Sequence, residues 1–375
     1  MKMNKWVAGA AAVAVLGAVA GCGTAANNTA GGNTAGGSNS TGSTTSNTAV
    51  TLNESGSSLL YPLFQNQWIA AYKSVDSNVT LTAASTGSGT GIQDAISGTV
   101  QIGASDAYLP AAEVQVHPTM VNIPLAISAQ QIMYNLPGIT GHLKLTGNVL
   151  AQIYEGKITK WNDTAITSLN PGVTLPNQTI IPIHRSDASG DSFLFSSLLT
   201  DTNNQWKSSV GESTSPSWPK VSVGVGATGN SGVVQALAQS KYSIGYVGIS
   251  YLDQATAKGI GYAALQNKAG NFVLPTQANI TAAANAQVGS TPANETISLI
   301  YGPGANSYPI INYEYAIINT KQSDPNTAAA LKKFLNWAIS PTGGNTTTNM
   351  SAVHFLALPA SIEKLSQAQI GKIGG

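Results

Sequence analysis

The pattern that decides the fold lies in residues 79–106, which read VTLTAASTGSGTGIQDAISGTVQIGASD. Val79 to Ala83 has the composition of a strand, and the loop rich in Gly and Ser after it opens a helix with apolar Ile92 and Ile96. Val100 to Ala104 predicts the next strand. This order is typical of an open α/β sheet, in which ligands bind beyond the carboxyl ends of the strands.

The same alternation continues to the C-terminus, and the chain from Ala49 onward is long enough for two domains of about 150 residues each. Further strands are predicted at Val50–Leu52, Ile132–Leu136, Ile180–Ile183, Ser243–Val247 and Ile310–Asn319. Further helices are predicted at Tyr61–Lys73, Gly147–Tyr154, Asp163–Leu169, Asp191–Leu199, Val233–Ser240 and Asn326–Ile339.

We interpret residues 1–21 as a lipoprotein signal peptide. Lys2 and Lys5 form a basic start, and Val7 to Ala20 is apolar but too short to span a bilayer comfortably. Small residues then precede Cys22, as in a bacterial lipobox, which predicts that this cysteine is acylated and becomes the mature N-terminus. The alternative is an ordinary signal peptide followed by a stray cysteine. Because Cys22 is the only cysteine, the chain cannot form an internal disulfide.

Residues 22–48 are interpreted as the acylated cysteine and a flexible tether. Gly23 to Thr48 contains only Gly, Ala, Ser, Thr and Asn and has no charge, so it cannot bury a core. A flexible tether of about 26 residues typically spans ~25–30 Å, which would hold the folded part clear of the lipid. We therefore expect an extracytoplasmic protein that is lipid-anchored to the cell membrane.

Charged residues make up only 9% of the 375 residues, and the formal net charge is +1. Removal of Lys2 and Lys5 with the signal peptide would change this charge to −1. No basic patch supports binding to nucleic acid. The surface must therefore consist largely of uncharged polar side chains. Because few carboxylates are present whose protonation could unfold the protein, we hypothesise that it works in an acidic exterior.

Arg185 is the only arginine of the chain. It lies in residues 184–192, which read HRSDASGDS. A guanidinium group is a flat, permanently charged fork that suits an oxyanion better than the ammonium group of lysine does. We therefore expect Arg185 to bind a ligand. The alternative is a structural ion pair with a nearby aspartate.

Four loops share one design, in which small hydroxyl and glycine residues follow a strand or a turn and mostly open a helix. A helix N-terminus presents unpaired N–H groups and a partial positive charge, and glycine allows close approach of the backbone. Together with Arg185, such loops could saturate a small tetrahedral anion without a counter-cation. For any one loop the alternative is helix capping by serine. The loops are residues 57–59, 87–89, 105–106 and 185–191.

Asp106 and Asp191 indicate which anion is bound. Ionised carboxylates repel a fully ionised oxyanion, but they accept hydrogen bonds from one that carries protons. Phosphate carries protons at physiological pH and sulfate does not, and each unmatched carboxylate facing sulfate would cost about 1–3 kcal/mol. Two aspartates suit H2PO4−, whereas Asp187 is expected to orient Arg185. The alternative is that Asp106 and Asp191 cap their own helices.

Several short motifs are spread along the chain. They are GSSLLYP at 56–62, TGSGTG at 86–91, IGASD at 102–106, IYEGKI at 153–158, WND at 161–163, RSDASGDSF at 185–193, GYV at 245–247 and LALP at 356–359. They resemble those of the phosphate-binding protein of bacterial ABC phosphate uptake systems. The resemblance covers essentially all of residues 49–375. The lipobox and residues 309–316, PIINYEYA, are similar to the cell-surface lipoprotein form of actinobacteria.

The resemblance implies an α/β protein with the two-domain Venus-flytrap fold of periplasmic binding proteins, with mixed sheets flanked by helices and two crossing hinge strands. Domain I would comprise residues 49–133 and 310–375, and domain II residues 134–309. The resemblance also implies phosphate contacts from Ser58, Leu59, Ser88, Asp106, Arg185, Ser189, Gly190 and Asp191. Many family members carry Thr in place of Asp191. Since a carboxylate only accepts hydrogen bonds, we expect weaker binding at high pH.

We therefore expect a monomeric binding component that captures inorganic phosphate and delivers it to the membrane subunits of an ABC permease. We expect no cofactor and no metal. The alternatives are a receptor for another tetrahedral oxyanion, a surface enzyme that processes phosphate esters, and an adhesin or signalling lipoprotein. The four histidines lack metal-ligand spacing, and neither a nucleophile elbow nor a P-loop is present, which argues against an enzyme.

Overall fold

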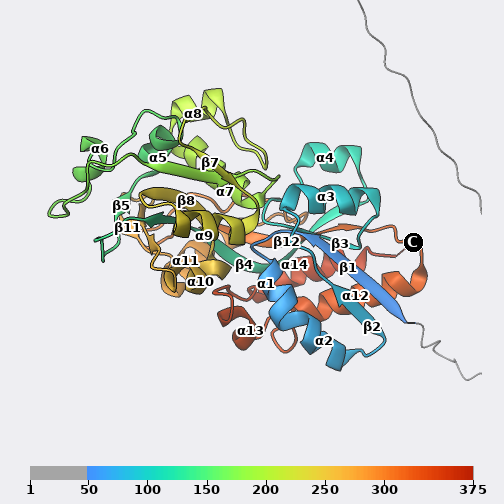
Figure 1. The fold of residues 1–375 in the computed structure, drawn as a ribbon. Helices are drawn as coiled ribbons and strands as arrows, with labels where there is room; N and C mark the ends of the chain where they lie inside the picture. Colours follow the sequence, from blue (N-terminus) through green and yellow to red (C-terminus); the bar gives the residue numbers. More distant parts are fainter. Residues whose placement is uncertain (1–48, 375) are drawn as a thin grey trace, which may run out of the picture. The chain divides into compact units, whose positions relative to one another are not determined.

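The computed structural model describes residues 49–374. The predicted signal peptide, acylated Cys22 and tether lie outside these residues. Among the described residues, no helix has both the length and the apolar character needed to cross a membrane. Strands and helices alternate along the described chain, and the predicted elements all occur, with ends that differ by a few residues for most of them (Figure 1).

The elements have the following bounds. The strands are β1 Val50–Gly56, β2 Val79–Thr82, β3 Ile102–Ser105, β4 Met120–Asn135, β5 Lys144–Leu145, β6 Ile181–Arg185, β7 Val225–Ala227, β8 Ser243–Gly248, β9 Gly261–Tyr262, β10 Ala264–Gln266, β11 Phe272–Val273 and β12 Ile311–Asn319. The helices are α1 Tyr61–Leu63, η1 Phe64–Trp68, α2 Ile69–Val75, α3 Ser88–Ser97, α4 Ala111–Val116, α5 Gly147–Tyr154, α6 Thr164–Thr167, α7 Gly190–Thr202, α8 Asn204–Ser209, α9 Gly229–Gln239, η2 Ile249–Tyr251, α10 Leu252–Thr256, α11 Gln277–Asn285, η3 Val288–Ser290, α12 Pro325–Ile339, α13 Thr347–Ser351 and α14 Ala360–Gly371.

The main sheet has the strand order β2-β1-β3-β12-β4-β8-β6-β7, and β9 also pairs with β4. Strand β1 is parallel to β2 and β3, and β6 is parallel to β7 and β8. Strands β12 and β4, in the middle, run antiparallel to their neighbours. We call β2, β1, β3 and β12 the first half-sheet, and β8, β6 and β7 the second half-sheet. The carboxyl ends of the parallel strands in each half carry the predicted ligand loops.

Strand β4 connects the two half-sheets. It pairs with β12 as far as Ala129 and with β8 from Gln130 onward. The sequence predicted only its last part, because Pro124 and several buried polar residues interrupt the apolar pattern earlier in the strand. Opposite Glu314 and Tyr315 the register shifts by one residue, which leaves a bulge in β4 next to Pro124.

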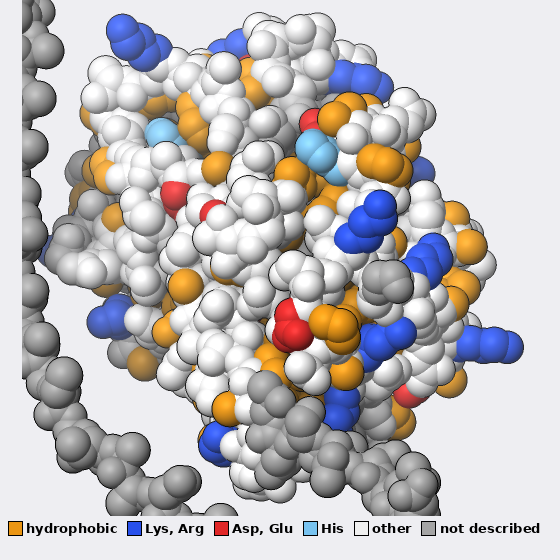
Figure 2. All heavy atoms as spheres, turned by 90° about the vertical axis from the view of Figure 1, so that its right-hand side faces the viewer, with side chains coloured by type: hydrophobic (Ala, Val, Ile, Leu, Met, Phe, Trp, Pro, Cys, Tyr) orange, Lys and Arg blue, Asp and Glu red, His pale blue; other side chains and the backbone are white. Residues whose placement is uncertain are grey.

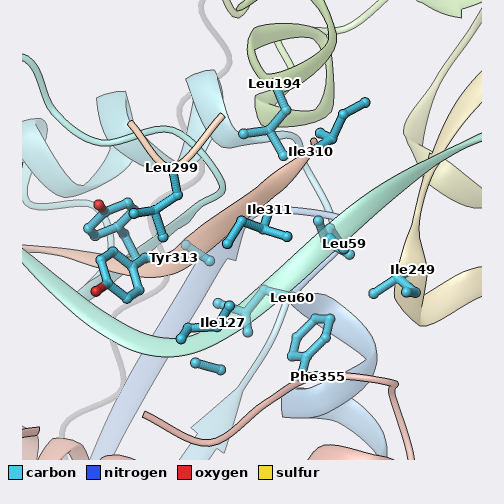
Figure 3. Close-up of a cluster of buried hydrophobic side chains, with 14 of the residues drawn as sticks. Leu59, Leu60, Ile127, Leu194, Ile249, Leu299, Ile310, Ile311, Tyr313 and Phe355 are labelled. Atoms are coloured by element: carbon cyan, nitrogen blue, oxygen red, sulfur yellow. The ribbon is translucent and has the colours of Figure 1, made fainter. Parts of the chain in front are cut away.

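Helices cover both faces of the sheet (Figure 1). In the first half, α3 lies on one face and α12 and α14 lie on the other, and all three contact the sheet. The apolar core continues from one half to the other. Figure 3 shows Leu59 of the first half and Ile127 of β4 in one buried cluster with Leu194 of α7 and Ile249 of η2. Burial of this apolar surface is the main stabilising contribution, at about 25 cal/mol per Å².

The surface agrees with the low content of charged residues. Figure 2 shows one face on which charged side chains are mostly well separated, with uncharged polar and backbone atoms between them. Among the described residues, the exposed large apolar side chains are valines: Val75, Val116, Val173 and Val223. The described surface therefore offers few large apolar anchors of the kind that dominate stable protein interfaces.

Candidate functional site

Arg185 is the last residue of β6, and its side chain is buried in the middle of the molecule. Its Nε donates to Asp187 Oδ1 at 2.7 Å, and its Nη2 bonds to Asp187 Oδ2. The remaining Nη1 donates to Ser58 Oγ and to Asp191 Oδ2, each at 3.0 Å. Asp187 thus holds the edge of the guanidinium group formed by Nε and Nη2, while Nη1 points to Ser58, which follows β1 of the first half-sheet.

Arg185 stays protonated despite its burial. Burial disfavours the charged form, but the bonds to Asp187 and the charge of Asp191 outweigh it and raise the pKa of Arg185 above its ordinary value. Burial likewise opposes the charge on Asp187, but the guanidinium group wins and lowers the pKa of Asp187. Asp187 also accepts from the N–H of Gly229 at 3.2 Å, which ties the pair to the start of α9.

Helix α7 begins directly after the arginine loop and brings Asp191 into the site. Ser189 is the N-cap residue, and its hydroxyl accepts from the N–H of Ser192 at 3.4 Å. Asp191, in the first turn, is completely buried. In addition to Arg185, its carboxylate accepts from Asn230 Nδ2 at 2.6 Å and from Gln130 Nε2 at 2.9 Å. Ser189 therefore caps α7, while the carboxylate of Asp191 accepts its hydrogen bonds from Arg185, Asn230 and Gln130.

Ser58 lies just before α1 in the first half. Its side chain accepts hydrogen bonds from several donors of the second half. Its Oγ accepts from Arg185 Nη1, from the N–H of Asn230 at 3.1 Å and from Asn230 Nδ2 at 2.9 Å. A hydroxyl oxygen has two lone pairs, so these three donors compete for it. The N-terminus of α9, which presents Asn230, is thus aimed at the same point as the arginine.

Ser88 and Asp106 complete the site from the ends of β2 and β3. Asp106 accepts a hydrogen bond from Ser57 Oγ on Oδ1, and its own N–H donates to Ser88 Oγ at 3.2 Å. A Cβ atom on Gly190 would lie 2.4 Å from Asp106 Oδ2 and 2.5 Å from Ser88 Oγ. Only a residue without a side chain fits at position 190, where the two halves meet.

Leu59 has a different place from the polar residues. Its side chain is fully buried in the core (Figure 3), and a Cβ on Gly248 would lie 2.4 Å from its Cδ1. Its N–H donates to Ser57 Oγ at 3.1 Å, and its carbonyl oxygen accepts from Ser250 Oγ at 2.7 Å. Leu59 therefore packs the first half against the loop that follows β8.

The two buried aspartates hold protons more tightly than aspartates in water. Burial, followed by the charge of Asp191, raises the pKa of Asp106 to about 7. Burial also raises the pKa of Asp191, against the charge of Arg185 and the bonds from Gln130 and Asn230. The site therefore combines one permanent cation with two carboxyl groups that can accept protons or donate them.

Two contributors were not predicted as site residues. Gln130 lies on β4, where that strand changes partners, and Asn230 opens a helix that was predicted only as an element. Both donate to Asp191. The Gly-Asn-Ser-Gly sequence at 229–232 has the same small-residue design as the four predicted loops and could have signalled Asn230. Nothing in the sequence around Gln130 indicates its role.

Among residues 49–374, no group of three or more His, Cys, Asp and Glu side chains could hold a metal ion. His184, the histidine next to Arg185, stacks on Trp218 with ring centroids 5.0 Å apart, and its Nδ1 faces the carbonyl of Arg185. The buried Arg185 and the hydroxyl and carboxyl groups around it suit the binding of a small oxyanion by hydrogen bonds.

A cavity of about 520 Å³ lies beside the site, between residues of α3 and α7. Its lining includes Tyr108 and Phe193, whose rings meet edge to face at 5.6 Å, and Gly89 and Ala188. The N–H of Gly89 donates to the carbonyl oxygen of Ala188 at 3.0 Å, so the two halves touch through backbone atoms at this position.

Comparison with known proteins identifies the family. The model of the PBP superfamily domain matches residues 40–342. The phosphate-binding protein PstS of Haemophilus influenzae is 36% identical over 322 residues, which are 86% of this chain and 92% of that protein. The chain belongs to the PstS family of phosphate-binding proteins. The PstS of Pasteurella multocida, also similar, is 37% identical over 323 residues, covering 86% of this chain and 90% of its own.

Solved structures show the same fold. A phosphate-binding protein from Stenotrophomonas maltophilia has a TM-score of 0.65 at 19% identity, covering 85% of this chain and 93% of its own. A high-affinity periplasmic phosphate-binding protein, solved with bound phosphate, has a TM-score of 0.67 at 20% identity, with coverage of 85% and 93%. These likenesses confirm the predicted fold class. The boundaries of the two domains stay a prediction.

Proposed function

We propose that this protein captures inorganic phosphate between its two half-sheets and delivers it to the membrane subunits of an ABC permease. The observation that carries the proposal is the convergence of a buried Arg185 with hydroxyl and carboxyl groups from both halves, above all Ser58 and Asp106. The family supports it, since its curated members are named phosphate-binding proteins. A structure from Clostridium perfringens, described as that of a phosphate ABC transporter substrate-binding protein with bound phosphate, shares the fold.

Each predicted contact has a distinct task in this proposal. Arg185 supplies the charge, while Ser58, Ser88, Ser189 and the N–H groups around Gly190 and Leu59 supply further polar groups for the phosphate oxygens. Asp106 and Asp191 accept hydrogen bonds from the P–OH groups of the ligand. Because Arg185 attracts any oxyanion, the two aspartates provide the discrimination against sulfate.

Binding and release require the halves to separate. The site residues come from both half-sheets and are almost completely buried, so phosphate can enter only if the halves move apart. Strand β4 crosses between them and changes partners at Ala129 and Gln130, which makes this region the natural hinge. We propose domain boundaries near residues 133 and 310 for the same reason.

The remaining expectations form part of the proposal. We propose that Cys22 carries the lipid anchor, that the tether keeps the binding domains outside the membrane, and that the protein acts as a monomer without catalytic activity. An assay with a generic phosphomonoester, with and without divalent metals, tests the last point. Measurable turnover that depends on Arg185 would contradict it.

Calorimetric titration of phosphate and sulfate into ligand-free protein tests the binding function. We expect tight binding of phosphate and at least about a hundredfold weaker binding of sulfate, which corresponds to ~2.7 kcal/mol. The matched control is Lys333→Gln, which removes an exposed cation on α12 far along the chain from the site loops. Equal affinity for both anions, or no phosphate binding at all, would overturn the proposal.

A further inference from the structure

A third buried carboxyl group lies directly behind the site. Glu314 on β12 is completely buried, and Asn312 links it to Asp106, because Asn312 Nδ2 donates to Glu314 Oε1 at 2.9 Å and to the carbonyl oxygen of Asp106 at 3.3 Å. Glu314 sits at the position where the pairing of β12 with β4 shifts by one residue. Glu314 belongs to the motif at 309–316, but neither the sequence analysis nor the proposed contacts with phosphate give it a role.

The partners of Glu314 indicate where its proton lies. Its Oε1 faces two donors, Ser128 Oγ and Asn312 Nδ2, the latter at 2.9 Å. Its Oε2 is buried and has no donor. Two carboxyl oxygens share a hydrogen bond only when one of them carries a proton. An ionised Glu314 would place an unmatched buried charge beside Asp106, whereas a protonated Glu314 can donate from Oε2 to Asp106.

Several other ionisable groups lie on the elements around this pair. Arg185 and Asp191 are those whose charges act on Asp106. Asp187 is already bonded to Arg185, and Asp94 of α3 accepts from Ser55 Oγ at 2.7 Å. The remaining ionisable side chains on the strands nearby are Glu54 of β1, Tyr246 of β8, and Tyr313 and Tyr315 of β12.

We propose that Glu314 is a positioning residue that stays protonated and donates a hydrogen bond to Asp106, so that Asp106 remains ionised and can accept a hydrogen bond from a P–OH group of the bound phosphate. This inference rests on the phosphate binding proposed above. No proton leaves Glu314 during binding. Its role is to fix the orientation of Asp106 and to keep one more negative charge out of the site.

The directions in which burial and neighbouring groups shift the two pKa values agree with this arrangement. Burial and then the charge of Asp106 raise the pKa of Glu314 well above its ordinary value. In the other direction, the hydrogen bond from Glu314 lowers the pKa of Asp106, which burial and Asp191 raise. Without that bond, Asp106 would bind a proton at higher pH and lose the free acceptor that distinguishes phosphate from sulfate.

Glu314→Gln is the decisive variant, because an amide has the shape of a protonated carboxyl and can donate to Asp106 while accepting from Ser128 and Asn312. We expect its phosphate affinity at neutral pH to lie within about threefold of the natural protein, with the same number of protons linked to binding. Titrations in buffers of different protonation enthalpy give that number. A gain in affinity of about tenfold or more, equivalent to ~1.4 kcal/mol, would mean that Glu314 is ionised and would overturn the inference.

Glu314→Leu removes the donor. We expect the acid limb of its affinity profile to shift to higher pH by about one unit, with sulfate discrimination lost over the same range. An unshifted limb would also overturn the inference. Should this variant fail to fold, the infrared difference spectrum at neutral pH between the natural protein and Glu314→Gln decides the question. We expect the variant to lose the contribution of one protonated carboxyl group, and no such loss would contradict the proposal.

These outcomes are separable from failure of the proposed function. If the natural protein binds no phosphate, the proposed function fails, whatever the variants do. If it binds phosphate in preference to sulfate but the Glu314 variants behave in the contrary ways described, only the role of Glu314 fails.

Discussion

Gly190 approaches Asp106 so closely that a Cβ at position 190 would lie 2.4 Å from Asp106 Oδ2. Gly190 opens α7 in the second half of the molecule, and Asp106 follows β3 in the first. The contact therefore exists only when the two halves are closed on each other. The two halves can therefore close only if residue 190 has no side chain.

Gly190→Ala should weaken phosphate binding strongly while leaving each half folded. The methyl group cannot share the space of Asp106 Oδ2 and Ser88 Oγ, so the closed state is disfavoured. We expect a loss of affinity of about a hundredfold or more in calorimetry, which is ~2.7 kcal/mol. Solution scattering should show the open form with phosphate present.

The matched control is Gly141→Ala. A Cβ at Gly141 would meet no atom within 4 Å, so binding should be unchanged. If Gly190→Ala binds phosphate as well as this control does, closure does not depend on the contact.

Arg185→Lys should fail to replace arginine although it keeps the charge. Lysine cannot bond to Asp187 through two nitrogens and also reach Ser58 and Asp191. Truncating one partner of a buried charge network costs about 2–5 kcal/mol, so we expect affinity to fall at least thirtyfold. Calorimetry at low and high salt checks this, and full affinity in the lysine variant would show that charge alone suffices.

Asp191→Thr should change how phosphate affinity depends on pH. At high pH, Asp191 is an ionised acceptor that occupies Arg185 and repels the more highly charged forms of phosphate. Threonine removes this charge and offers a hydroxyl donor. We therefore expect the variant to bind phosphate more tightly than the natural protein at pH 8, with a smaller difference at pH 5. A parallel pH dependence of the two proteins would contradict this role of Asp191.

The ligand-free protein should be more stable in mild acid than at alkaline pH. Burial raises the pKa of Glu295 to about 8, and that of Asp106 to about 7. Both exceed the ordinary carboxyl value of ~4, so between about pH 4 and pH 8 the folded chain binds more protons than the unfolded chain. The free energy of unfolding must then fall as pH rises through this window, by up to about 1.4 kcal/mol per pH unit for each such group.

Calorimetric unfolding from pH 5 to pH 8 measures this slope as a falling Tm. Glu295 bonds to Ser366 at 2.8 Å, far along the chain from the phosphate loops, so Glu295→Gln should flatten the slope without affecting binding. A Tm that rises steadily toward pH 8 would contradict the expectation, and with it the hypothesis of an acidic working environment.

Much of the architecture follows from local patterns. The strand and helix around residues 79–97 form as expected, because small and apolar residues recur with the periods of a strand and of a helix. Most of strand β4 was not predicted from the sequence. Its polar residues, among them Ser128 and Gln130, are buried by both sheet halves and look like loop residues when read without their partners.

The residues of the site were likewise only partly predictable from the sequence. Motif and composition single out Arg185 and its neighbours, because a lone arginine in a loop rich in Gly and Ser has few structural reasons to be there. They do not reveal Gln130, Asn230 or Glu314. Gln130 and Asn230 are hydrogen-bonded to Asp191, and Glu314 is linked to Asp106 through Asn312. Each link joins segments distant in the chain, and such hydrogen bonds produce no periodic pattern in the sequence.

The order of amino acids thus specified the alternating elements, the anion-binding loops and the charge that attracts an oxyanion. Those properties depend on residue type and on short spacings. The closing contact at Gly190 and the carboxyl pair of Asp106 and Glu314 were decided only when the chain folded. Proximity and burial control where protons reside, and both arise from the packing of the two half-sheets against each other.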